Sequence, residues 1–368
     1  MKKRSVLIAA QNLCVGGVQT SLVNLLKNMA KTDEYDIDLF VFGRGEFLTE
    51  VPEMVKVIYG NRLLSLAATP FKEVVERGGN IDLALRMFLM ILVRLAGSDR
   101  LYRWFFKKQR IKKTYDAAVS YFNDVPNNYF NRGTNLFVSE FADAKEKTAW
   151  IHNDPIKMGF DRDECIETYR SFDRIVCVSK AVKKKFDQLL PEYADKTEVV
   201  YNTFVPEEII EKANLYDPGV NKNLYNIVTV CRVDNIQKRT DKIIDVCVRL
   251  KSEGITNFCW RIIGGGPDID RDKKHAAMDG VGDLVIFEGE KSNPYPYIRS
   301  SDLFALYSAY EGYPMVVGEA MIIGVPILTS GYAAAHEQIP ETKGQIAEDD
   351  DDFYIKLKEL ISSKKTCI

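Results

Sequence analysis

The most constraining feature of this 368-residue chain is the alternation of short apolar runs with helix-like periodicity. In the first half, residues 6–10, 37–42 and 175–179 are apolar runs of strand length, and helical spacing of apolar residues follows at 20–29 and 180–190. Strands of a parallel sheet are continuous apolar runs because the connecting helices cover both faces of the sheet. The pattern therefore predicts an α/β fold built on parallel sheet.

A polar segment with two prolines interrupts the alternation after residue 205. The alternation then resumes, and a chain of this length exceeds what one hydrophobic core usually organises. Polar, proline-containing segments of this kind are typical of interdomain linkers. We predict an N-terminal domain at 1–205, a linker at 206–223, and a C-terminal domain at 224–368 with a short final helix at 353–363.

Composition excludes several classes of protein. The net charge of −2 offers no electrostatic basis for binding nucleic acid. The seven Cys form no Cys-x-x-Cys pair and are odd in number, which predicts reduced cysteines in the cytoplasm. The three His lack metal-ligand spacing, so we expect no metal site. The basic N-terminus leads directly into a strand without a signal-peptide cleavage pattern.

Two carboxylates flank a turn in the second half of the chain. Glu311 and Glu319 lie eight positions apart across a segment with Gly and Pro, after the apolar strand 302–307. We expect Glu311 in the strand-to-helix loop and Glu319 about two turns into the helix. The amides of Met315 and Val316 would form an anion site at the helix start. Carboxylates can instead accept sugar or ribose hydroxyls, so the combination suits a phosphorylated sugar.

A pair of cations precedes this turn in the sequence. Arg232 follows an apolar strand, and Lys238 lies six residues later in a loop that begins a helix. Two cations near the carboxyl end of a strand can neutralise a diphosphate without a metal ion, and Arg offers a bidentate fork. The alternative is two exposed cations at a helix start. The nearby carboxylates favour the functional interpretation.

Three glycines and one histidine complete the candidate set. Gly16 and Gly17 would let the first loop approach a ligand without a Cβ atom. Gly265 lies in a glycine run that lacks the spacing of a dinucleotide fingerprint. His152 ends a strand, where ligand crevices of α/β proteins lie, and could hydrogen-bond a hydroxyl or assist proton movement. A lone His is more often structural, so both interpretations stay open.

An unusual apolar stretch lies between the strands of the first half, followed by a basic and aromatic stretch. Residues 83–96 are apolar apart from Arg86 and Arg94, and this stretch is too short to span a membrane. Residues 100–113 combine many Lys and Arg with Trp and Phe. One interpretation is a buried helix followed by a solvated basic helix. The other is a patch on an anionic membrane surface with Trp and Phe at the interface.

Several ordered motifs resemble those of the family-4 retaining glycosyltransferases of GT-B architecture, of the bacterial surface-polysaccharide type. Each motif is weak alone, but their order and spacing cover nearly the whole chain. Gln19 stands where this family often carries an acidic residue, so the chain departs from the pattern there. The motifs lie at 15–17, 150–154, 178–180, 200–202, 230–233, 237–238, 262–267, 287–289 and 311–319.

The resemblance implies two Rossmann-like domains facing across a cleft, the first for the acceptor and the second for a nucleotide sugar. It implies that Arg232 and Lys238 hold the donor diphosphate and stabilise the leaving group. Glu319 would take the ribose hydroxyls, and Glu311 would contact the donor sugar or support the reacting face. His152 would act at the acceptor side. The remaining expected donor-binding residues are Gly16, Gly17, Gly265, Met315 and Val316.

The predicted function is transfer of a hexosyl unit from a nucleotide diphosphate sugar, expected to be a UDP-sugar, with retention at the anomeric carbon. The expected acceptor is a saccharide, lipid-linked, in surface polysaccharide biosynthesis, with no cofactor and no metal. Residues 83–113 would contact the cytoplasmic face of the plasma membrane. The alternatives are a nucleotide-sugar epimerase of the same architecture and a non-catalytic nucleotide-sugar-binding scaffold. A glycosidase pair is rejected because both carboxylates fall in one loop–helix unit.

Overall fold

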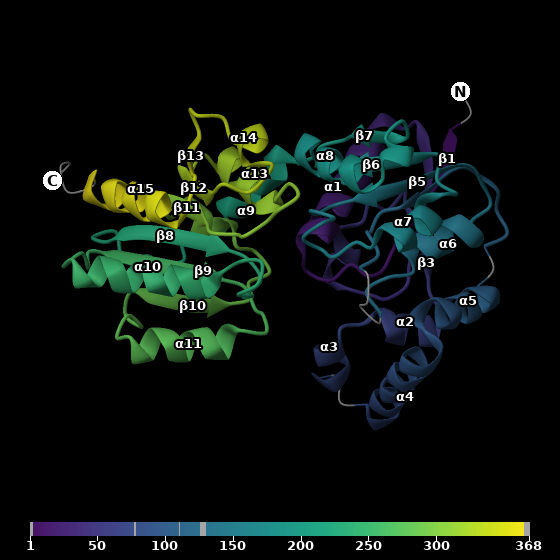
Figure 1. Cartoon of the computed structure of the whole chain (residues 1–368), viewed down its shortest axis with the longest axis horizontal. Helices are drawn as coiled ribbons and strands as arrows, with labels where there is room; N and C mark the ends of the chain where they lie inside the picture. Colours follow the sequence, from purple (N-terminus) through teal and green to yellow (C-terminus); the bar gives the residue numbers. More distant parts are fainter. Residues whose placement is uncertain (1–2, 77–78, 110, 126–129, 364–368) are drawn as a thin grey trace. The chain divides into compact units, whose positions relative to one another are not determined.

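The computed structural model describes residues 3–76, 79–109, 111–125 and 130–363, and Figure 1 shows the order of their helices and strands. The chain divides into two compact units, Met1–Thr203 and Phe204–Ile368. Each unit is a parallel sheet with helices packed on it, so the predicted α/β class with two Rossmann-like domains is confirmed.

The first unit contains a seven-stranded sheet in the order β3-β2-β1-β4-β5-β6-β7, and all neighbouring strands pair in parallel. The strand numbers fall from β3 to β1 and then rise from β4 to β7, so the chain order reverses between β1 and β4. Ligands of open α/β sheets bind outside the carboxyl ends of the strands at such a switch point. The strands are β1 (Arg4–Ala10), β2 (Tyr35–Val41), β3 (Lys56–Tyr59), β4 (Tyr115–Ser120), β5 (Ala144–Ile151), β6 (Arg174–Cys177) and β7 (Thr197–Val199).

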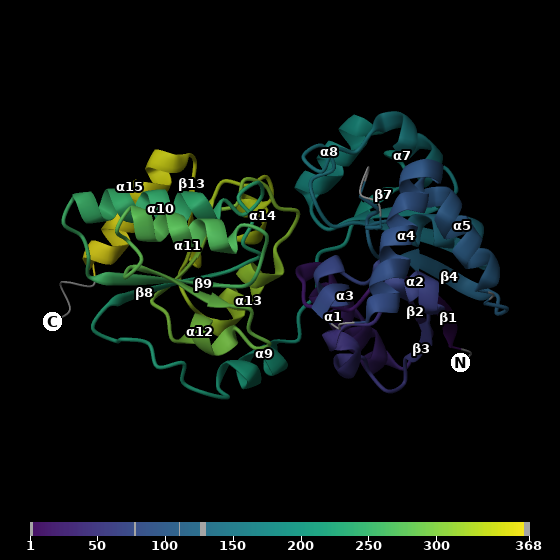
Figure 2. The ribbon, with the colours of Figure 1, turned by 90° about the horizontal axis from the view of Figure 1, so that it is seen from below.

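The helices of the first unit begin with capping residues in several cases. The side chains of Asn61, Asp161 and Ser179 accept hydrogen bonds from first-turn amides of α2, α7 and α8. Figure 2, seen from below, shows α4 beside α2 and α3. The helices are α1 (Gly17–Thr32), η1 (Glu46–Glu50), α2 (Arg62–Ala68), α3 (Phe71–Glu76), α4 (Asn80–Ala96), α5 (Ser98–Lys108), α6 (Thr134–Glu140), α7 (Arg162–Tyr169), α8 (Lys180–Leu189) and η2 (Pro191–Tyr193).

Helices α4 and α5 depart from each interpretation of residues 83–113 in one respect, and the membrane contact itself stays a prediction. The predicted buried helix is wrong, because α4 buries only Arg86, Leu89 and Val93 and exposes most of its other apolar side chains. The predicted placement of Phe at a membrane interface is also wrong, because Phe105 and Phe106 are buried. Phe106 packs against the rings of Phe42, directly after β2, and of Phe137 in α6. These aromatic contacts favour burial of a side chain that its basic sequence context would leave exposed.

None of the helices in the described ranges is long and apolar enough to cross a bilayer. Arg110, part of the basic stretch, lies outside the described residues.

The second unit repeats the strand order of the first six strands of the first unit. Its sheet has the order β10-β9-β8-β11-β12-β13, again with parallel pairing throughout. The switch point therefore lies between β8 and β11. The strands are β8 (Tyr225–Val230), β9 (Phe258–Ile263), β10 (Val285–Gly289), β11 (Leu303–Leu306), β12 (Ile327–Ser330) and β13 (Gly344–Ala347).

One helix of the second unit falls within the segment predicted as a linker. Helix α9 follows Val205 and packs against α12 and α13, so this segment is not wholly irregular. The final helix, α15, packs on β12 and β13. The helices are α9 (Pro206–Ala213), α10 (Thr240–Ser252), α11 (Ile269–Met278), α12 (Tyr295–Arg299), α13 (Met315–Ile323), α14 (Ala335–Gln338) and α15 (Asp350–Ser363).

A fully buried tryptophan ties the central strands of the second sheet together. The indole Nε1 of Trp260 donates a hydrogen bond to Thr229 Oγ1 at 2.9 Å. The Thr229 hydroxyl in turn donates to the carbonyl oxygen of Ala305 at 2.6 Å. Buried polar groups need such partners, because each one left unpaired costs about 1–3 kcal/mol. This chain joins β9, β8 and β11, which fixes the two strands that border the switch point.

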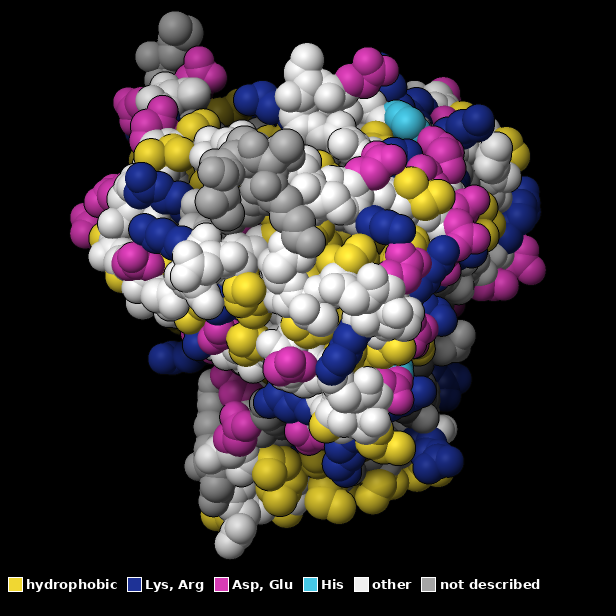
Figure 3. Space-filling model, turned by 90° about the vertical axis from the view of Figure 1, so that its left-hand side faces the viewer, with side chains coloured by type: hydrophobic (Ala, Val, Ile, Leu, Met, Phe, Trp, Pro, Cys, Tyr) yellow, Lys and Arg dark blue, Asp and Glu magenta, His cyan; other side chains and the backbone are white. Residues whose placement is uncertain are grey.

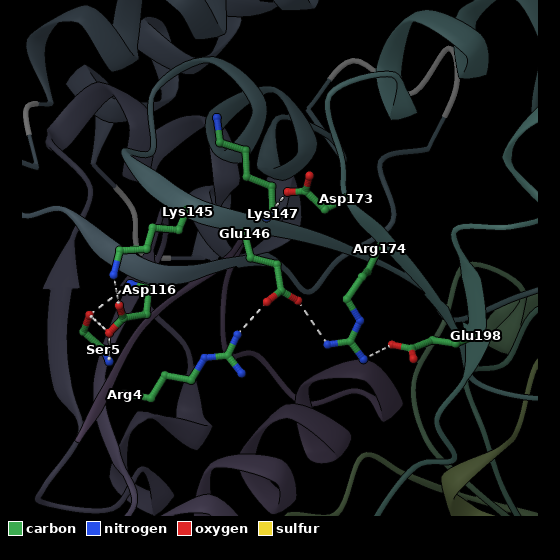
Figure 4. Close-up of polar contacts among 9 residues, drawn as sticks. All are labelled: Arg4, Ser5, Asp116, Lys145, Glu146, Lys147, Asp173, Arg174 and Glu198. Carbon is green, nitrogen blue, oxygen red and sulfur yellow. Dashed lines mark hydrogen bonds and ion pairs between the residues drawn. The ribbon is translucent and has the colours of Figure 1, made fainter. Parts of the chain in front are cut away.

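A row of alternating charges crosses the first sheet near the start of its strands (Figure 4). A guanidinium nitrogen of Arg4 lies 2.6 Å from one carboxylate oxygen of Glu146. Arg174 approaches the other oxygen of Glu146 at 3.1 Å and also pairs with Glu198. The row therefore links β1, β5, β6 and β7 through one shared carboxylate. A second group in the same view joins Ser5, Asp116 and Lys145.

Replacement of Glu146 by alanine tests this row. The variant should lose about 1 kcal/mol of unfolding free energy at low salt, because two guanidiniums lose their shared carboxylate. The loss should shrink in 1 M salt, which screens charges at the surface. Urea unfolding at the two salt concentrations provides the measurement.

Glu167→Ala is the matched control, since the ion pair that the described residues give Glu167 is a single long one, to Arg170 at 3.6 Å, and both side chains are 71% exposed. This change should be nearly neutral. Equal stability of the Glu146→Ala variant and the parent chain at low salt would show that the row contributes nothing.

Candidate functional site

The loop between β8 and α10 carries Arg232 and Lys238, and an aspartate shapes it. The Asp234 carboxylate accepts hydrogen bonds from the amides of Ile236 at 2.9 Å and Gln237 at 3.0 Å. Asp side chains stabilise turns by accepting from amides two and three residues on. The turn directs the chain back over the end of β8 before α10 begins.

Each of the two predicted cations has a carboxylate partner. Arg232 lies 2.6 Å from Asp234, and 60% of its side chain is exposed. Lys238 forms an ion pair with Glu311, and both side chains are largely buried. Arg232 can therefore turn toward a ligand at little cost, whereas Lys238 is fixed in place.

Glu311 lies in the loop between β11 and α13, as predicted. Its second oxygen faces the side-chain amide of Gln237 at 3.5 Å, and the same amide lies 3.3 Å from the carbonyl oxygen of Tyr310. The loops that follow β8 and β11 thus meet across the switch point of the second sheet. Glu311 positions Lys238 there, and its predicted contact with a donor sugar stays a prediction.

Helix α13 begins at Met315, directly after Pro314, in agreement with the predicted helix start. No acidic residue lies in its first turn, and among the described residues no side chain forms a capping hydrogen bond there. Gln338 donates a hydrogen bond to the carbonyl oxygen of Pro314 at 2.8 Å, which holds the entry to the helix. The amides of Met315 and Val316 have no intrahelical acceptor, and the helix dipole adds positive potential at this end. The arrangement suits an anion.

Glu319 lies just over one turn into α13, so the predicted depth of two turns is wrong. Only 4% of the residue is exposed, and the Tyr295 hydroxyl donates to its carboxylate at 3.1 Å. Burial raises the pKa of Glu319 to about 7, and the hydrogen bond from Tyr295 and the charge of Lys212 oppose this effect. Near neutral pH the group is divided between the acid, which can donate, and the carboxylate, which accepts from hydroxyls.

The glycine run after β9 packs against the backbone of the β8–α10 loop. A Cβ atom on Gly264 would lie 1.9 Å from the carbonyl oxygen of Cys231, and one on Gly266 would lie 2.1 Å from that of Val233. At Gly265 it would meet the end of a side chain, and the Gly265 carbonyl accepts from the Val233 amide at 2.8 Å. Gly264 and Gly266 therefore have structural reasons to be glycine, and the donor-binding role of Gly265 stays a prediction.

A buried polar network that the sequence analysis missed anchors the same loop. Asp272 of α11 is fully buried and accepts from Asn235 at 2.8 Å and from Thr240 at 2.6 Å. The amide of Asn235 donates to Asp268 at 2.9 Å. The turn at Asp234 has a local signal in the Asp-Asn dipeptide of a loop. Asp272 has none, because its partners lie more than thirty residues away in sequence.

His152 follows β5 in the first unit and is buried among aromatic rings. Its Nε2 lies 2.5 Å from the carbonyl oxygen of Tyr121, so Nε2 carries the proton and Nδ1 is an acceptor. The rings of Tyr121 and Trp150 lie 4.7 and 5.7 Å away. Burial lowers the pKa of His152 to about 4, so the ring is neutral at physiological pH. It can accept a hydrogen bond from a hydroxyl there but holds no second proton.

The loop that contains Gly16 and Gly17 follows β1. Gly16 is extended, with φ 173°, so its backbone does not require glycine, and α1 begins at Gly17. A Cβ atom on Gly16 would lie 2.5 Å from the side-chain oxygen of Gln19, which is the end of a flexible side chain. Gln19 itself donates to Asn12 at 3.0 Å. The fold therefore does not require glycine at position 16, and its predicted role in making space for a ligand stays a prediction.

Tyr121 connects this loop to His152. The hydroxyls of Ser21 and Tyr121 lie 2.7 Å apart, and Ser21 also donates to Asn202 at 2.8 Å. Because the Tyr121 carbonyl accepts from His152, one hydrogen-bonded chain joins the start of α1 to the end of β5. The structure therefore places Gly16 and Gly17 after β1 and His152 after β5, the two strands on either side of β4.

Among the residues that the structure describes, no group of three or more His, Cys, Asp or Glu side chains could hold a metal ion. In the loops that follow β8 and β11, positive charge comes from Arg232, Lys238 and the amides at the start of α13.

Comparison with known proteins identifies relatives of this chain. Residues 214–367 match the family model described as glycosyl transferases group 1. The chain is 31% identical over 199 residues to the O-antigen biosynthesis glycosyltransferase WbnH of Escherichia coli, covering 53% of each protein. It is 29% identical over 138 residues to the lipopolysaccharide 1,6-galactosyltransferase of Salmonella typhimurium, covering 35% of this chain and 37% of that protein. The chain spans about half or less of the length of these relatives.

The fold has close neighbours among solved structures. Anabaena Alr3699/HepE, solved in complex with UDP and glucose, superposes with a TM-score of 0.69 and 17% identity. The match covers 98% of this chain and 91% of that chain. Likeness at this identity concerns the fold, and the predicted GT-B architecture is confirmed.

Replacement of Gly264 by alanine tests the packing of the glycine run. Its φ is +142°, and the added methyl group would collide with the Cys231 carbonyl, so we expect a loss of at least about 2 kcal/mol of unfolding free energy. Gly282→Ala is the control, because its Cβ atom would meet its nearest neighbours at 3.8 Å. Thermal or urea unfolding compares the two, and equal stability would contradict the collision.

The raised pKa of Glu319 predicts a pH dependence of stability. The folded chain binds this proton more tightly than the unfolded chain, so stability falls as the pH rises from the ordinary pKa of Glu, near 4.3, to about 7. Glu319→Gln removes this ionisation. From pH 5 to pH 8, the unfolding free energy of the Glu319→Gln variant should rise by about 2–3 kcal/mol relative to that of the parent chain.

Urea unfolding at both pH values provides the measurement, with the exposed Glu341→Gln as control. A difference between the Glu319→Gln variant and the parent chain that does not change with pH would show that Glu319 titrates normally.

Proposed function

We propose that the chain transfers a hexosyl unit from a nucleotide diphosphate sugar to a saccharide acceptor, because residues 214–367 match the glycosyl transferases group 1 family model. The observation that carries this proposal is the meeting of Lys238, Glu311 and the start of α13 at the switch point of the second sheet. The names of the relatives support surface polysaccharide biosynthesis as the process. The UDP bound to a protein of the same fold supports a UDP-sugar as donor.

The proposed donor site holds the diphosphate by positive charge. Arg232 would leave Asp234 and grip two phosphate oxygens with its guanidinium fork. Lys238 and the amides of α13 would face the same phosphates from fixed positions. These groups supply charge where the leaving diphosphate becomes more negative, and electrostatic stabilisation of this kind is usually the largest single contribution to catalysis. On this basis we propose that the transfer needs no metal ion.

The nucleoside end would be held by Glu319. A buried carboxylate flanked by the Tyr295 hydroxyl can accept both hydroxyls of a ribose, and an apolar group in that position could not. Because Glu319 is fixed by α13, the ribose and the phosphates would be held by one rigid helix.

The proposed reaction exchanges one bond to the anomeric carbon for another. The bond from this carbon to the donor phosphate oxygen breaks, and a bond to the acceptor hydroxyl oxygen forms on the same face. The acceptor proton passes to the departing diphosphate. Retention follows from the family that the motifs resemble. His152 would orient the acceptor hydroxyl through Nδ1, since its low pKa makes it a weak base.

We further propose that the acceptor is lipid-linked and that residues 83–113 contact the cytoplasmic face of a membrane. The apolar side chains that α4 exposes support this contact. Peripheral binding would bring the enzyme to an acceptor that cannot leave the bilayer.

Arg232→Gln tests the donor site. The side chain is mostly exposed, so the fold should be unaffected, and kcat/KM for nucleotide release from UDP-, GDP- or ADP-hexoses should fall by about 10²-fold. Lys242→Gln on the exposed side of α10 is the matched control and should change little. Addition of a chelator should leave the rate unchanged.

Other results would redirect the proposal. Chelator-sensitive turnover that magnesium restores would exclude metal independence. Conversion of the nucleotide sugar into its epimer without nucleotide release would identify an epimerase. A thermal shift on donor binding without any turnover would identify a binding scaffold.

A further inference from the structure

Helix α4 presents its most apolar side to solvent. The residues Ile81, Met87, Phe88, Ile91 and Leu95, here named the α4 outer face, are between 54% and 79% exposed. Their spacing of three, four and seven places them on one side of the helix. Single exposed apolar residues are ordinary, but a continuous row of this size marks an interaction surface.

The side of α4 that faces the protein is more polar than a core-facing side should be. It buries Leu89, Val93 and Arg86, and Arg86 is only 6% exposed. The Arg86 guanidinium lies 3.9 Å from the centre of the Phe130 ring. A helix that turns a guanidinium inward and phenylalanine outward is inverted relative to an ordinary surface helix. This inversion indicates that the outer face has an apolar partner.

Neighbouring helices extend the apolar surface. Phe71 and Val75 of α3, which packs against α4, are 46% and 47% exposed. Trp104 of α5 is 43% exposed, and the Lys108 ammonium lies 4.1 Å from the centre of its ring. Figure 3 shows hydrophobic side chains gathered along its lower edge, where α4 lies, with Lys and Arg side chains beside them.

The charge of this region is opposite to that of the rest of the chain. Residues 80–113 contain nine Lys or Arg and two Asp, although the whole chain has a net charge of −2. The two acidic residues, Asp82 and Asp99, are already paired with Arg62 and Arg132. Arg86 is buried, and Arg103 and Lys113 are paired with carboxylates. Exposed cations on the two contacting helices, among them Arg94 of α4 and Lys107 and Lys108 of α5, form a positively charged rim beside the α4 outer face.

We propose that the α4 outer face inserts into the surface of an anionic lipid bilayer, with α4 lying in the plane of the membrane. This specifies the membrane contact of the proposed function and rests on it only for its biological purpose. At 1.5 Å per residue, α4 is about 25 Å long and would bury its outer face along its whole length. Insertion of apolar side chains with cations at headgroup level is the arrangement of interfacial helices.

The chemistry of the rim favours lipid over a second protein as the occupant. Lysine is depleted in protein interfaces. The cations of α5 include the exposed Lys107 and Lys108. Each such cation near an anionic membrane contributes about 1 kcal/mol, and Trp prefers the headgroup level that Trp104 would reach.

The inserting element differs from the one that the sequence favours. Of the aromatic residues in the basic stretch, the fold buries Phe105 and Phe106 and exposes Trp104. The apolar contact comes from α4, and α5 contributes the cations and one indole. Binding should therefore depend on both apolar burial and charge.

Sedimentation of the full chain with lipid vesicles tests the proposal. The chain should pellet with vesicles of equal parts phosphatidylglycerol and phosphatidylcholine, and more weakly with phosphatidylcholine alone. Phe88→Ser with Ile91→Ser should lower the partition coefficient at least about tenfold. Both side chains are more than half exposed, so the fold should survive.

Two control variants separate the surface from general effects. Met278→Ser with Ile355→Ser removes exposed apolar side chains from the second unit and should leave binding unchanged. Arg94→Gln with Lys107→Gln should weaken binding to the anionic vesicles about tenfold or more. The matched control for this loss of charge is Lys273→Gln with Lys274→Gln on α11.

Several outcomes would overturn the proposal. One is that the Phe88→Ser, Ile91→Ser variant and the parent chain partition equally. Another is that the parent chain fails to pellet with anionic vesicles. Loss of a dimer in that variant, without vesicle binding by the parent chain, would identify a second copy as the occupant. Nucleotide release from a donor sugar, measured without vesicles, should be the same in the Phe88→Ser, Ile91→Ser variant as in the parent chain. This assay detects a failure of the proposed transferase activity separately from a failure of membrane binding.

Discussion

The ion pair between Lys238 and Glu311 joins the two loops on which the proposed donor site is built. Burying two charges costs several kcal/mol, and an apolar pair of similar volume is often more stable. Removing one partner alone would leave an unpaired charge, at a cost of about 3–5 kcal/mol. The pair lies at the carboxyl ends of β8 and β11, held by the turn at Asp234 and by Gln237. The geometry of Arg232 and of the start of α13 relative to Lys238 depends on this contact.

Periodicity predicted the layers of the fold well, because alternation of apolar runs and helical spacing reports burial on both faces of a sheet. The start of α13 was also predictable, since Pro314 marks it locally. The exposure of α4 was not predictable from composition, because apolar residues are buried by default and only the packing of α2, α3 and α5 shows which side remains open. Phe105 and Phe106 show the converse, because they are buried in the core although the Lys and Arg residues around them in the sequence indicate an exposed segment.

The candidate site shows the same division between local and distant information. The Asp234 turn has its signal within three residues, whereas the partners of Glu319 and Asp272 lie far away in sequence and are brought close by the fold. The ionisation of Glu319 and His152 follows from burial, which a motif does not report. The sequence thus identified residues of the two switch points, while their protonation and mutual contacts required coordinates.

If Glu319 binds a ribose as proposed, its near-neutral pKa couples that binding to release of a proton. A diol that binds the carboxylate would displace a proton from every molecule in which Glu319 is protonated. Below pH 7 that proton enters the buffer, and the measured heat of binding then includes the ionisation heat of the buffer. Above pH 7 little proton is exchanged. One buried side chain would therefore couple the capture of a nucleotide to the acidity of its surroundings.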